Sequence, residues 1–194
     1  PIKLIEINKE DSELIRVMAY NTLSDGLTDN SRIDNFTRII NTINPQIIGF
    51  NETYDTSESD VLNILDSSLG GNWYIKKYPG DNITASRFPI KNFWYVNNRI
   101  LATLIELDDG IYNSDLLFIV GHLSCCWKDE ERQQQVDELS KFILDAKNPG
   151  GEITLVENTP IVFLGDMNLV GHSQQYYTII EGDIQDTNTY GQGG

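Results

Sequence analysis

The stretch from Pro160 to Asn168, PIVFLGDMN, is the part of the chain from which its fold and chemistry are best predicted. A short apolar run that follows a proline is typical of a strand buried on both faces. Gly165 marks the end of that strand, where the backbone turns or passes close to another group. Asp166 and Asn168 follow, and in extended geometry residues two positions apart point the same way. The stretch predicts a carboxylate and an amide facing one site, although both are also ordinary turn residues.

Earlier apolar strands end on polar side chains in the same manner. Such strands are predicted over residues 14–20, 46–50 and 116–121, and the polar side chains after them are Asn21, Glu52 and His122. Strands that pack side by side can bring these ends to one rim of a sheet. Carboxylates, amides and an imidazole together suit metal-assisted phosphoryl chemistry. Oxygen ligands favour Mg²⁺, Mn²⁺ or Ca²⁺, whereas a zinc site would need more His or Cys ligands than the 2 histidines supply.

Each of these residues also has a purely structural interpretation. Asn21 can cap the turn that follows it, and Glu52 can be a solvated acid at a strand end. The apolar residues that precede Glu52 favour the ligand interpretation. His122 fits a hydrogen-bonded core histidine as well as it fits a site residue.

The remaining elements follow from hydrophobic periodicity and from turn residues. Helices are predicted over residues 31–42, with Ser31 as the cap, and over 57–69, 129–147 and 174–180. Further strands are predicted over residues 1–8, 73–78, 83–88, 93–96 and 100–107, and no regular element is predicted over 183–194.

Length and composition indicate one globular domain over residues 1–194. The 194 residues are 40% hydrophobic and 22% charged, which is enough apolar material for one substantial core. No apolar run approaches the roughly 20 residues of a membrane span, and no secretory leader is visible. Cys125 and Cys126 are adjacent, and they are predicted to be packing residues rather than a bridge or a metal site.

The charge balance favours some partners over others. Lys and Arg total 14 against 29 Asp and Glu, a formal net charge of −15. Such a surface repels phosphate backbones, so a small phosphoester or a lipid headgroup is favoured over nucleic acid as the substrate. Clustered carboxylates would attract a divalent cation. We expect a monomer.

The polar strand ends carry a resemblance to a known family. The motifs are MAYNTL at 18–23, IIGFNE at 47–52, SRFPI at 86–90, GHL at 121–123 and GDMN at 165–168. In order and rough spacing they resemble the endonuclease/exonuclease/phosphatase superfamily, which includes the deoxyribonuclease I-like nucleases. Any one motif is weak, whereas all of them in order are specific.

The resemblance implies an α/β (α+β) fold, a four-layer sandwich of two mostly antiparallel sheets face to face with helices outside. It also implies that Glu52 is the principal Mg²⁺ ligand, with Asn21 beside it in the metal and phosphate shell. By the same resemblance Asp166 orients and deprotonates the attacking water, Asn168 hydrogen-bonds a phosphate oxygen, and His122 lies close to the scissile phosphate.

The chain departs from the family pattern in two places. Asn51 stands where the family commonly has Gln, which shortens the amide beside Glu52. The family also ends in a strand that carries Asp-His, and His172 does not fit that motif because no further strand precedes it. We therefore expect a domain that is incomplete at its C-terminal end and lacks the last strands of the sandwich.

The function predicted is metal-dependent phosphoester hydrolysis by in-line attack of water. The alternative is a non-catalytic binding or scaffold module that keeps the fold, or an inactive fragment of such an enzyme. A two-metal, calcineurin-like phosphatase is excluded, since neither its Asn-His-Asp run nor its late Gly-His-x-His motif is present.

Overall fold

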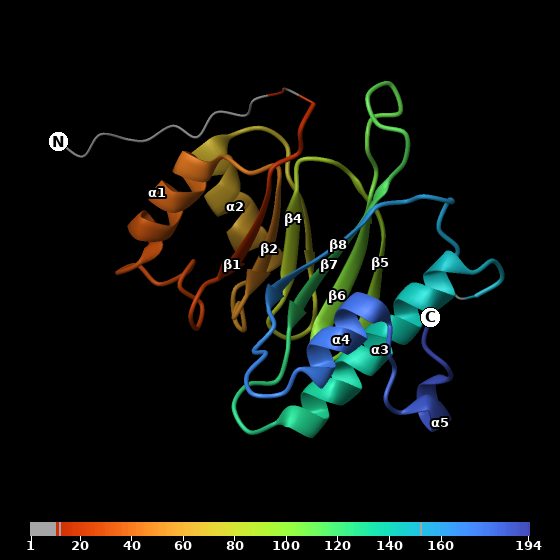
Figure 1. The fold of residues 1–194 in the computed structure, drawn as a ribbon. Helices are drawn as coiled ribbons and strands as arrows, with labels where there is room; N and C mark the ends of the chain where they lie inside the picture. Colours follow the sequence, from red (N-terminus) through yellow and green to blue (C-terminus); the bar gives the residue numbers. More distant parts are fainter. Residues whose placement is uncertain (1–10, 12, 152) are drawn as a thin grey trace.

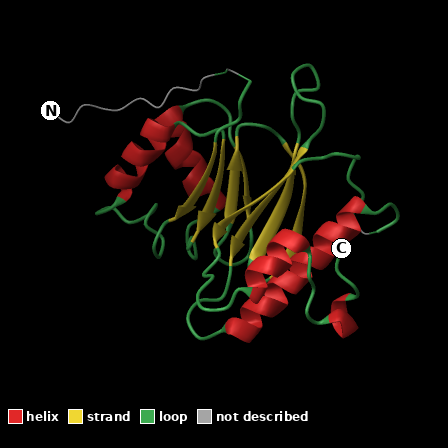
Figure 2. Cartoon of the chain, viewed as in Figure 1, coloured by secondary structure: helices red, strands yellow, loops and turns green. Residues whose placement is uncertain are grey.

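Two four-stranded sheets lie face to face, and helices cover the outer face of each sheet (Figures 1 and 2). This arrangement comes from a computed structural model that describes residue 11 and residues 13–151 and 153–194. The four-layer α/β sandwich predicted from the sequence is therefore confirmed. Within each sheet two of the three strand pairings are antiparallel and one is parallel.

The first sheet has the strand order β1-β2-β4-β3. Its strands are β1 (Val17–Asn21), β2 (Ile47–Asn51), β3 (Tyr74–Lys77) and β4 (Ile83–Ser86). Helices α1 (Ile33–Ile43) and α2 (Glu58–Leu69) lie on its outer face. Ser57 caps α2 through a capping box with Asp60, which explains why the start of this helix is readable in the sequence.

The second sheet has the order β5-β6-β7-β8. Its strands are β5 (Ile90–Asn97), β6 (Ile100–Ile105), β7 (Leu116–His122) and β8 (Ile161–Asp166). The helices after β7 and β8 are α3 (Asp129–Lys147), α4 (Gln174–Glu181) and α5 (Thr187–Tyr190). In the part of the chain that the structure describes, no helix has the length and apolar character needed to cross a membrane.

The apolar core is divided among the layers. One cluster lies between α1, α2 and the first sheet, and another lies between α3 and the second sheet. The third cluster fills the space between the sheets and includes Ile47, Phe118 and Val120, all fully buried. The sheets approach closely at Gly49, where a Cβ would lie 2.6 Å from a Leu164 methyl carbon. Close packing of the two inner faces fixes how the strand ends meet.

The strands that carry the predicted site residues end on the same side of the sandwich. β1 runs parallel to β2 with Asn21 opposite Asn51, and β7 runs parallel to β8 with His122 opposite Asp166. β1 and β8 are edge strands of different sheets, and they lie against each other. The loop of residues 106–115, between β6 and β7, stands at the opposite end of the molecule (Figure 1).

Several local predictions are wrong. β8 is half-buried along its length rather than buried on both faces, because it is an edge strand. α1 begins at Ile33 without a side-chain cap, and the Ser31 hydroxyl instead donates to Asp29 Oδ1 over 2.6 Å. The C-terminal stretch contains α5, which Asp186 caps by accepting a hydrogen bond from the Thr189 N–H. The strand predicted over residues 1–8 lies outside the described residues.

Gly165 provides a test of how β8 joins β7. Its φ of +133° is rarely adopted by residues with a side chain, and a Cβ there would overlap the Gly121 carbonyl oxygen on the neighbouring strand. Gly150 also has a positive φ, +93°, but a Cβ there would meet nothing within 4 Å. We expect Gly165→Ala to lower the free energy of unfolding in urea by more than the roughly 1–3 kcal/mol of backbone strain alone. Gly150→Ala should lose only the strain, so equal losses for the two variants would contradict the strand pairing.

Candidate active site

Two carboxylates from different sheets share one amide. Asn21, at the end of β1, donates from Nδ2 to Glu52 Oε1 over 2.8 Å and to Asp166 Oδ2 over 3.0 Å. Glu52 directly follows β2, and Asp166 is the last residue of β8. Residues 31 and 145 positions apart in the sequence therefore meet at the seam between the sheets.

The loop after β1 holds the Glu52 carboxylate from its other side. Glu52 Oε2 accepts the Ser24 backbone N–H over 2.9 Å, and Asn21 Oδ1 accepts the Leu23 N–H over 2.9 Å. Glu52 itself has φ +58°, a left-handed conformation that turns the chain out of β2. Because both carboxylate oxygens are held by N–H donors, the side chain has a fixed orientation.

His122 lies beside these acids and is buried, with 7% of its surface exposed. Its Nδ1 pairs with Oδ2 of Asp81, which is itself buried, and the Arg99 guanidinium lies 3.6 Å from the same oxygen. Burial by itself lowers the pKa of His122, but the hydrogen bond and the charge of Asp81 outweigh it, with a further contribution from Asp166. The net effect is a raised pKa, so this site favours the imidazolium form.

The three side chains converge closely enough to hold one ion. One ligand atom from each of Glu52, His122 and Asp166 lies within 4.8 Å of the other two. Among the described residues, no Lys or Arg forms an ion pair with Glu52 or Asp166. Two neighbouring carboxylates carry more negative charge than one imidazolium offsets, and a divalent cation would relieve the remaining repulsion. The carboxylate oxygens fit such a cation, whereas the imidazole of His122 could join them as a ligand only in its neutral form.

The side-chain amide of Asn51 hydrogen-bonds to the backbone and side chains that adjoin Glu52, His122 and Asp166. Its Nδ2 donates to Asn82 Oδ1 over 2.8 Å and to the Gly121 carbonyl over 3.1 Å. Its Oδ1 accepts the Asp166 backbone N–H over 3.0 Å. Asn51 is 1% exposed, so both donor hydrogens and the acceptor are used in a buried setting. Although shorter than Gln, this side chain reaches both sheets.

Asn168 reaches the site by a different route from the one predicted. The strand ends at Asp166, and Asn168 has φ +46°, so the rule for extended residues two apart does not apply. The Asn168 N–H donates to Asp166 Oδ1 over 3.2 Å, and its Nδ2 donates to the Leu123 carbonyl over 3.0 Å. Asn168 thus closes a tight turn on Asp166 and links it to the residue after His122.

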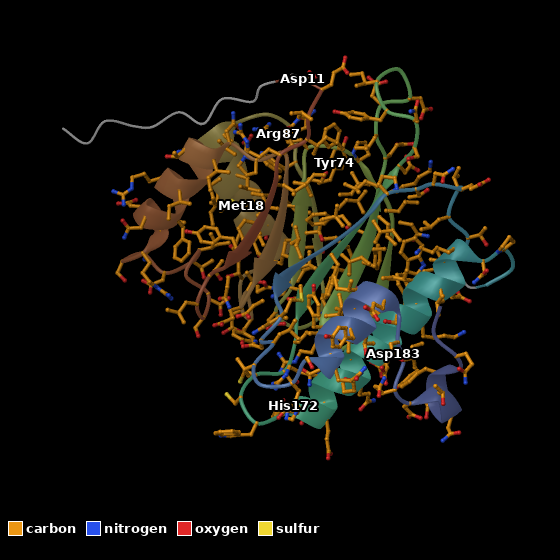
Figure 3. The ribbon with its side chains drawn as sticks, viewed as in Figure 1. Asp11, Met18, Tyr74, Arg87, His172 and Asp183 are labelled. Carbon is orange, nitrogen blue, oxygen red and sulfur yellow. The ribbon has the colours of Figure 1, made fainter. Side chains whose placement is uncertain are left out.

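His172 stands apart from this cluster. Its side chain is 67% exposed, and its Nε2 lies 3.8 Å from Asp129 Oδ2. Figure 3 labels it in the loop at the lower end of the molecule, near the start of α3. It is a loop residue, in agreement with the expectation that it does not belong to an Asp-His motif at a strand end.

Asp81 and Asn82, which lie between the strands predicted over residues 73–78 and 83–88, were not predicted to belong to the site. Both are buried: Asp81 pairs with His122, and Asn82 accepts from Asn51 while donating to the Arg99 carbonyl over 2.7 Å. The available signal was an acid and an amide directly before the buried strand β4. Turn composition hid it, because Asp and Asn are common in exposed turns as well.

Exposed apolar side chains occur in the loops that follow the site residues. Leu23 is 66% exposed after Asn21, Trp127 is 96% exposed after His122, and Val170 is 56% exposed after Asn168. The fully buried Arg132 joins two of these loops, because its Nη1 donates to the Ser124 carbonyl over 2.7 Å and its Nη2 donates to that of Val170 over 3.5 Å. We call Leu23, Trp127 and Val170 the apolar rim; Arg132 ties the loops of Trp127 and Val170 to α3.

Comparisons with known proteins agree with this fold. The sequence matches the Endonuclease/Exonuclease/phosphatase family over residues 18–190. No curated protein matches it. Among solved structures, a mannosyl-6-phosphatase from Bacteroides thetaiotaomicron VPI-5482 is similar with TM-score 0.61 at 15% identity, covering 87% of this chain and 71% of that one.

Two further structures share the fold. The human Nocturnin catalytic domain has TM-score 0.59 and 21% identity, covering 84% of this chain and 68% of that one. A beta toxin from Staphylococcus aureus, in a hairpin deletion mutant, has TM-score 0.59 and 14% identity, with 87% and 72% covered. The chain spans 68% to 72% of the length of these three proteins. The family match over most of the sequence, together with this fold, shows that the chain belongs to the endonuclease/exonuclease/phosphatase family.

Proposed function

We propose that the chain carries the site of a metal-dependent phosphoester hydrolase that acts by in-line attack of water. The observation that carries the proposal is the convergence of Glu52, His122 and Asp166 within 4.8 Å without a Lys or Arg ion pair on either carboxylate among the described residues. Family membership supports hydrolysis of a phosphoester as the reaction class.

Glu52 would hold the cation, since its carboxylate is fixed by hydrogen bonds and has lone pairs left for an ion. A divalent ion bound there would neutralise charge on a phosphate oxygen. We propose Mg²⁺, with Mn²⁺ and Ca²⁺ as the alternatives for oxygen-rich ligand sets. Asn21 presents its amide nitrogen to both acids, so its role would be to keep the two carboxylates in register.

Asp166 would prepare the attacking water. Its Oδ1 accepts the Asn168 N–H and its Oδ2 accepts from Asn21, which fixes the direction of the carboxylate and leaves lone pairs for a water proton. Asn168 would present its remaining amide hydrogen to a phosphate oxygen. The backbone of Asp166 is held by Asn51, so the base is positioned by both sheets.

His122 would face the scissile phosphate as a cationic donor. Its Nδ1 is occupied by Asp81, which leaves Nε2 for substrate. The raised pKa of His122 keeps the imidazolium populated to higher pH than in an ordinary histidine. Such a donor stabilises negative charge that builds up on a phosphate oxygen during the reaction.

The surroundings favour a phosphoester with an apolar body over nucleic acid. The net charge of −15 opposes binding of a polyanion, whereas the apolar rim offers Leu23, Trp127 and Val170 to the part of the substrate outside the site. A lipid headgroup ester, or a small ester with an aromatic group, has the required combination of one phosphate and an apolar attachment.

Substitution of the two acids tests the reaction. With bis(p-nitrophenyl) phosphate and Mg²⁺, we expect Glu52→Gln and Asp166→Asn each to lower kcat/KM by about 10²–10⁴-fold, because one loses a cation ligand and the other loses the base. Glu106→Gln is the matched control, since this acid lies at the opposite end of the sandwich and contacts Lys91. A chelator should abolish the wild-type rate, and added Mg²⁺ should restore it.

Wild-type turnover in either acid variant would refute the assignment. If the wild-type chain bound phosphoesters without hydrolysing them, the non-catalytic binding module would be the correct function instead.

The His122–Asp81 pair can be tested by NMR titration of the two histidines. Asp81→Asn removes the anion that stabilises the imidazolium, so we expect the pKa of His122 to fall, with the resonances of the distant, exposed His172 serving to identify those of His122. An unaltered His122 midpoint would mean that Asp81 does not control its charge.

The apolar rim predicts substrate selectivity. Burial of a large apolar side chain by substrate is worth about 1.5–3 kcal/mol, which corresponds to roughly tenfold to a hundredfold in kcat/KM. We expect Trp127→Ala to lose this factor on an aryl or acyl-chain phosphodiester and little on a methyl ester. Ile111→Ala, at an apolar residue 52% exposed in the opposite loop, is the control. Equal losses on both substrates would exclude the rim as a selective surface.

A further inference from the structure

Cys125 and Cys126 lie in the loop that connects His122 at the end of β7 to the start of α3. Both are free and exposed, so the prediction that they pack in the core is wrong. Their Sγ atoms are 2.8 Å apart, which is closer than two unbonded sulfur atoms normally pack. The two thiols therefore face each other in solvent rather than pointing to opposite sides of the loop.

The loop is held in this conformation by Arg132 from α3. The fully buried guanidinium donates from Nη1 to the carbonyls of Ser124, over 2.7 Å, and Cys126, over 3.1 Å. Cys126 has φ +64°, a left-handed conformation that is uncommon for a residue with a side chain. A backbone fixed on both sides of Cys125 keeps the two thiols together, which lowers the entropic cost of joining them.

We propose that Cys125 and Cys126 form a reversible dithiol–disulfide modification site whose closure changes the surroundings of Trp127. The reactant is a low-molecular-weight disulfide of the oxidised glutathione type. The thiolate of one cysteine attacks a sulfur of that disulfide, and a glutathione thiolate leaves. The neighbouring cysteine then attacks the protein sulfur of the mixed disulfide and releases the second glutathione. The protein loses two hydrogens, and one small disulfide becomes two thiols.

The electrostatics of the pair suit this exchange. The hydrogen bond to Cys125 and repulsion from a Cys125 thiolate raise the pKa of the Cys126 thiol. Cys126 therefore keeps its proton more firmly when its neighbour becomes an attacking thiolate, and it remains available as the resolving thiol. Adjacent Cα atoms are about 3.8 Å apart, below the usual minimum of about 4.4 Å for a disulfide. A disulfide between Cys125 and Cys126 would therefore be strained and easily reduced, which makes the modification reversible.

Trp127 reports closure because it directly follows the pair. It lines a cavity of about 290 Å³ with Cys126, Val170 and His172. Ring closure rotates the backbone at Cys126 and loosens the Arg132 hydrogen bond to its carbonyl, so the indole moves relative to this cavity. The chemistry of the two thiols stands whether or not the chain hydrolyses phosphoesters.

The experiment uses the whole chain, reduced and then incubated with oxidised glutathione. In the wild type we expect both free thiols to disappear, the intact mass to fall by two hydrogens, and no adduct to remain. Cys125→Ser and Cys126→Ser each lack the resolving thiol and should each keep one glutathione. A stable adduct on the wild type, or a disulfide between two chains in place of the loss of two hydrogens, would overturn the proposal.

Tryptophan fluorescence provides the second measurement. We expect oxidation to change the emission of the wild type and to leave Trp127→Phe unchanged, since Trp73 and Trp94 lie in the two outer core clusters. A wild-type spectrum that is the same before and after ring closure would overturn the link to Trp127. Reduction by dithiothreitol should restore both the mass and the spectrum.

Discussion

The side-chain amide of Asn51 joins the two sheets at the point where the site forms. It donates to the Gly121 carbonyl of the second sheet and accepts the Asp166 backbone N–H, while its other hydrogen goes to Asn82. Leaving any one of these buried groups without its hydrogen bond would cost about 1–3 kcal/mol of folding stability. The residue after Asn51 is Glu52, so the same amide that locks the sheets together also sets the distance between the two acids of the site.

That distance creates an electrostatic problem: among the described residues no Lys or Arg forms an ion pair with either acid, and one imidazolium cannot offset two carboxylates. Glu52 and Asp166 share the neutral amide of Asn21, and a ring nitrogen of His122 lies within 4.8 Å of a carboxylate oxygen of each. Asp81 and Arg99 are committed to His122 and to each other. Repulsion between the acids is the physical reason for expecting a divalent cation, and it explains how a chain of net charge −15 can still attract a phosphate locally.

Regular elements were predictable where one local signal dominates. The limits of α3, Asp129 and Lys147, follow from the periodic apolar residues and the Asn-Pro-Gly-Gly stop, and the fully buried β7 follows from its continuous apolar run. The burial of Asp81, the left-handed turn at Asn168 and the close approach of the two cysteine thiols were not predictable. Each depends on a partner far away in the sequence or in another element, namely His122, Leu123 and Arg132. The half-buried state of β8 likewise depends on its position at a sheet edge.

The central claim is that the acids of the two sheets form one cation site. The most direct measurement is anomalous diffraction from crystals of this chain soaked in Mn²⁺, which substitutes for Mg²⁺ at oxygen-rich sites. A single strong peak between the carboxylates of Glu52 and Asp166, within reach of His122, is the predicted result. The absence of a peak between Glu52 and Asp166, in crystals whose surface carboxylates do bind Mn²⁺, would contradict the claim.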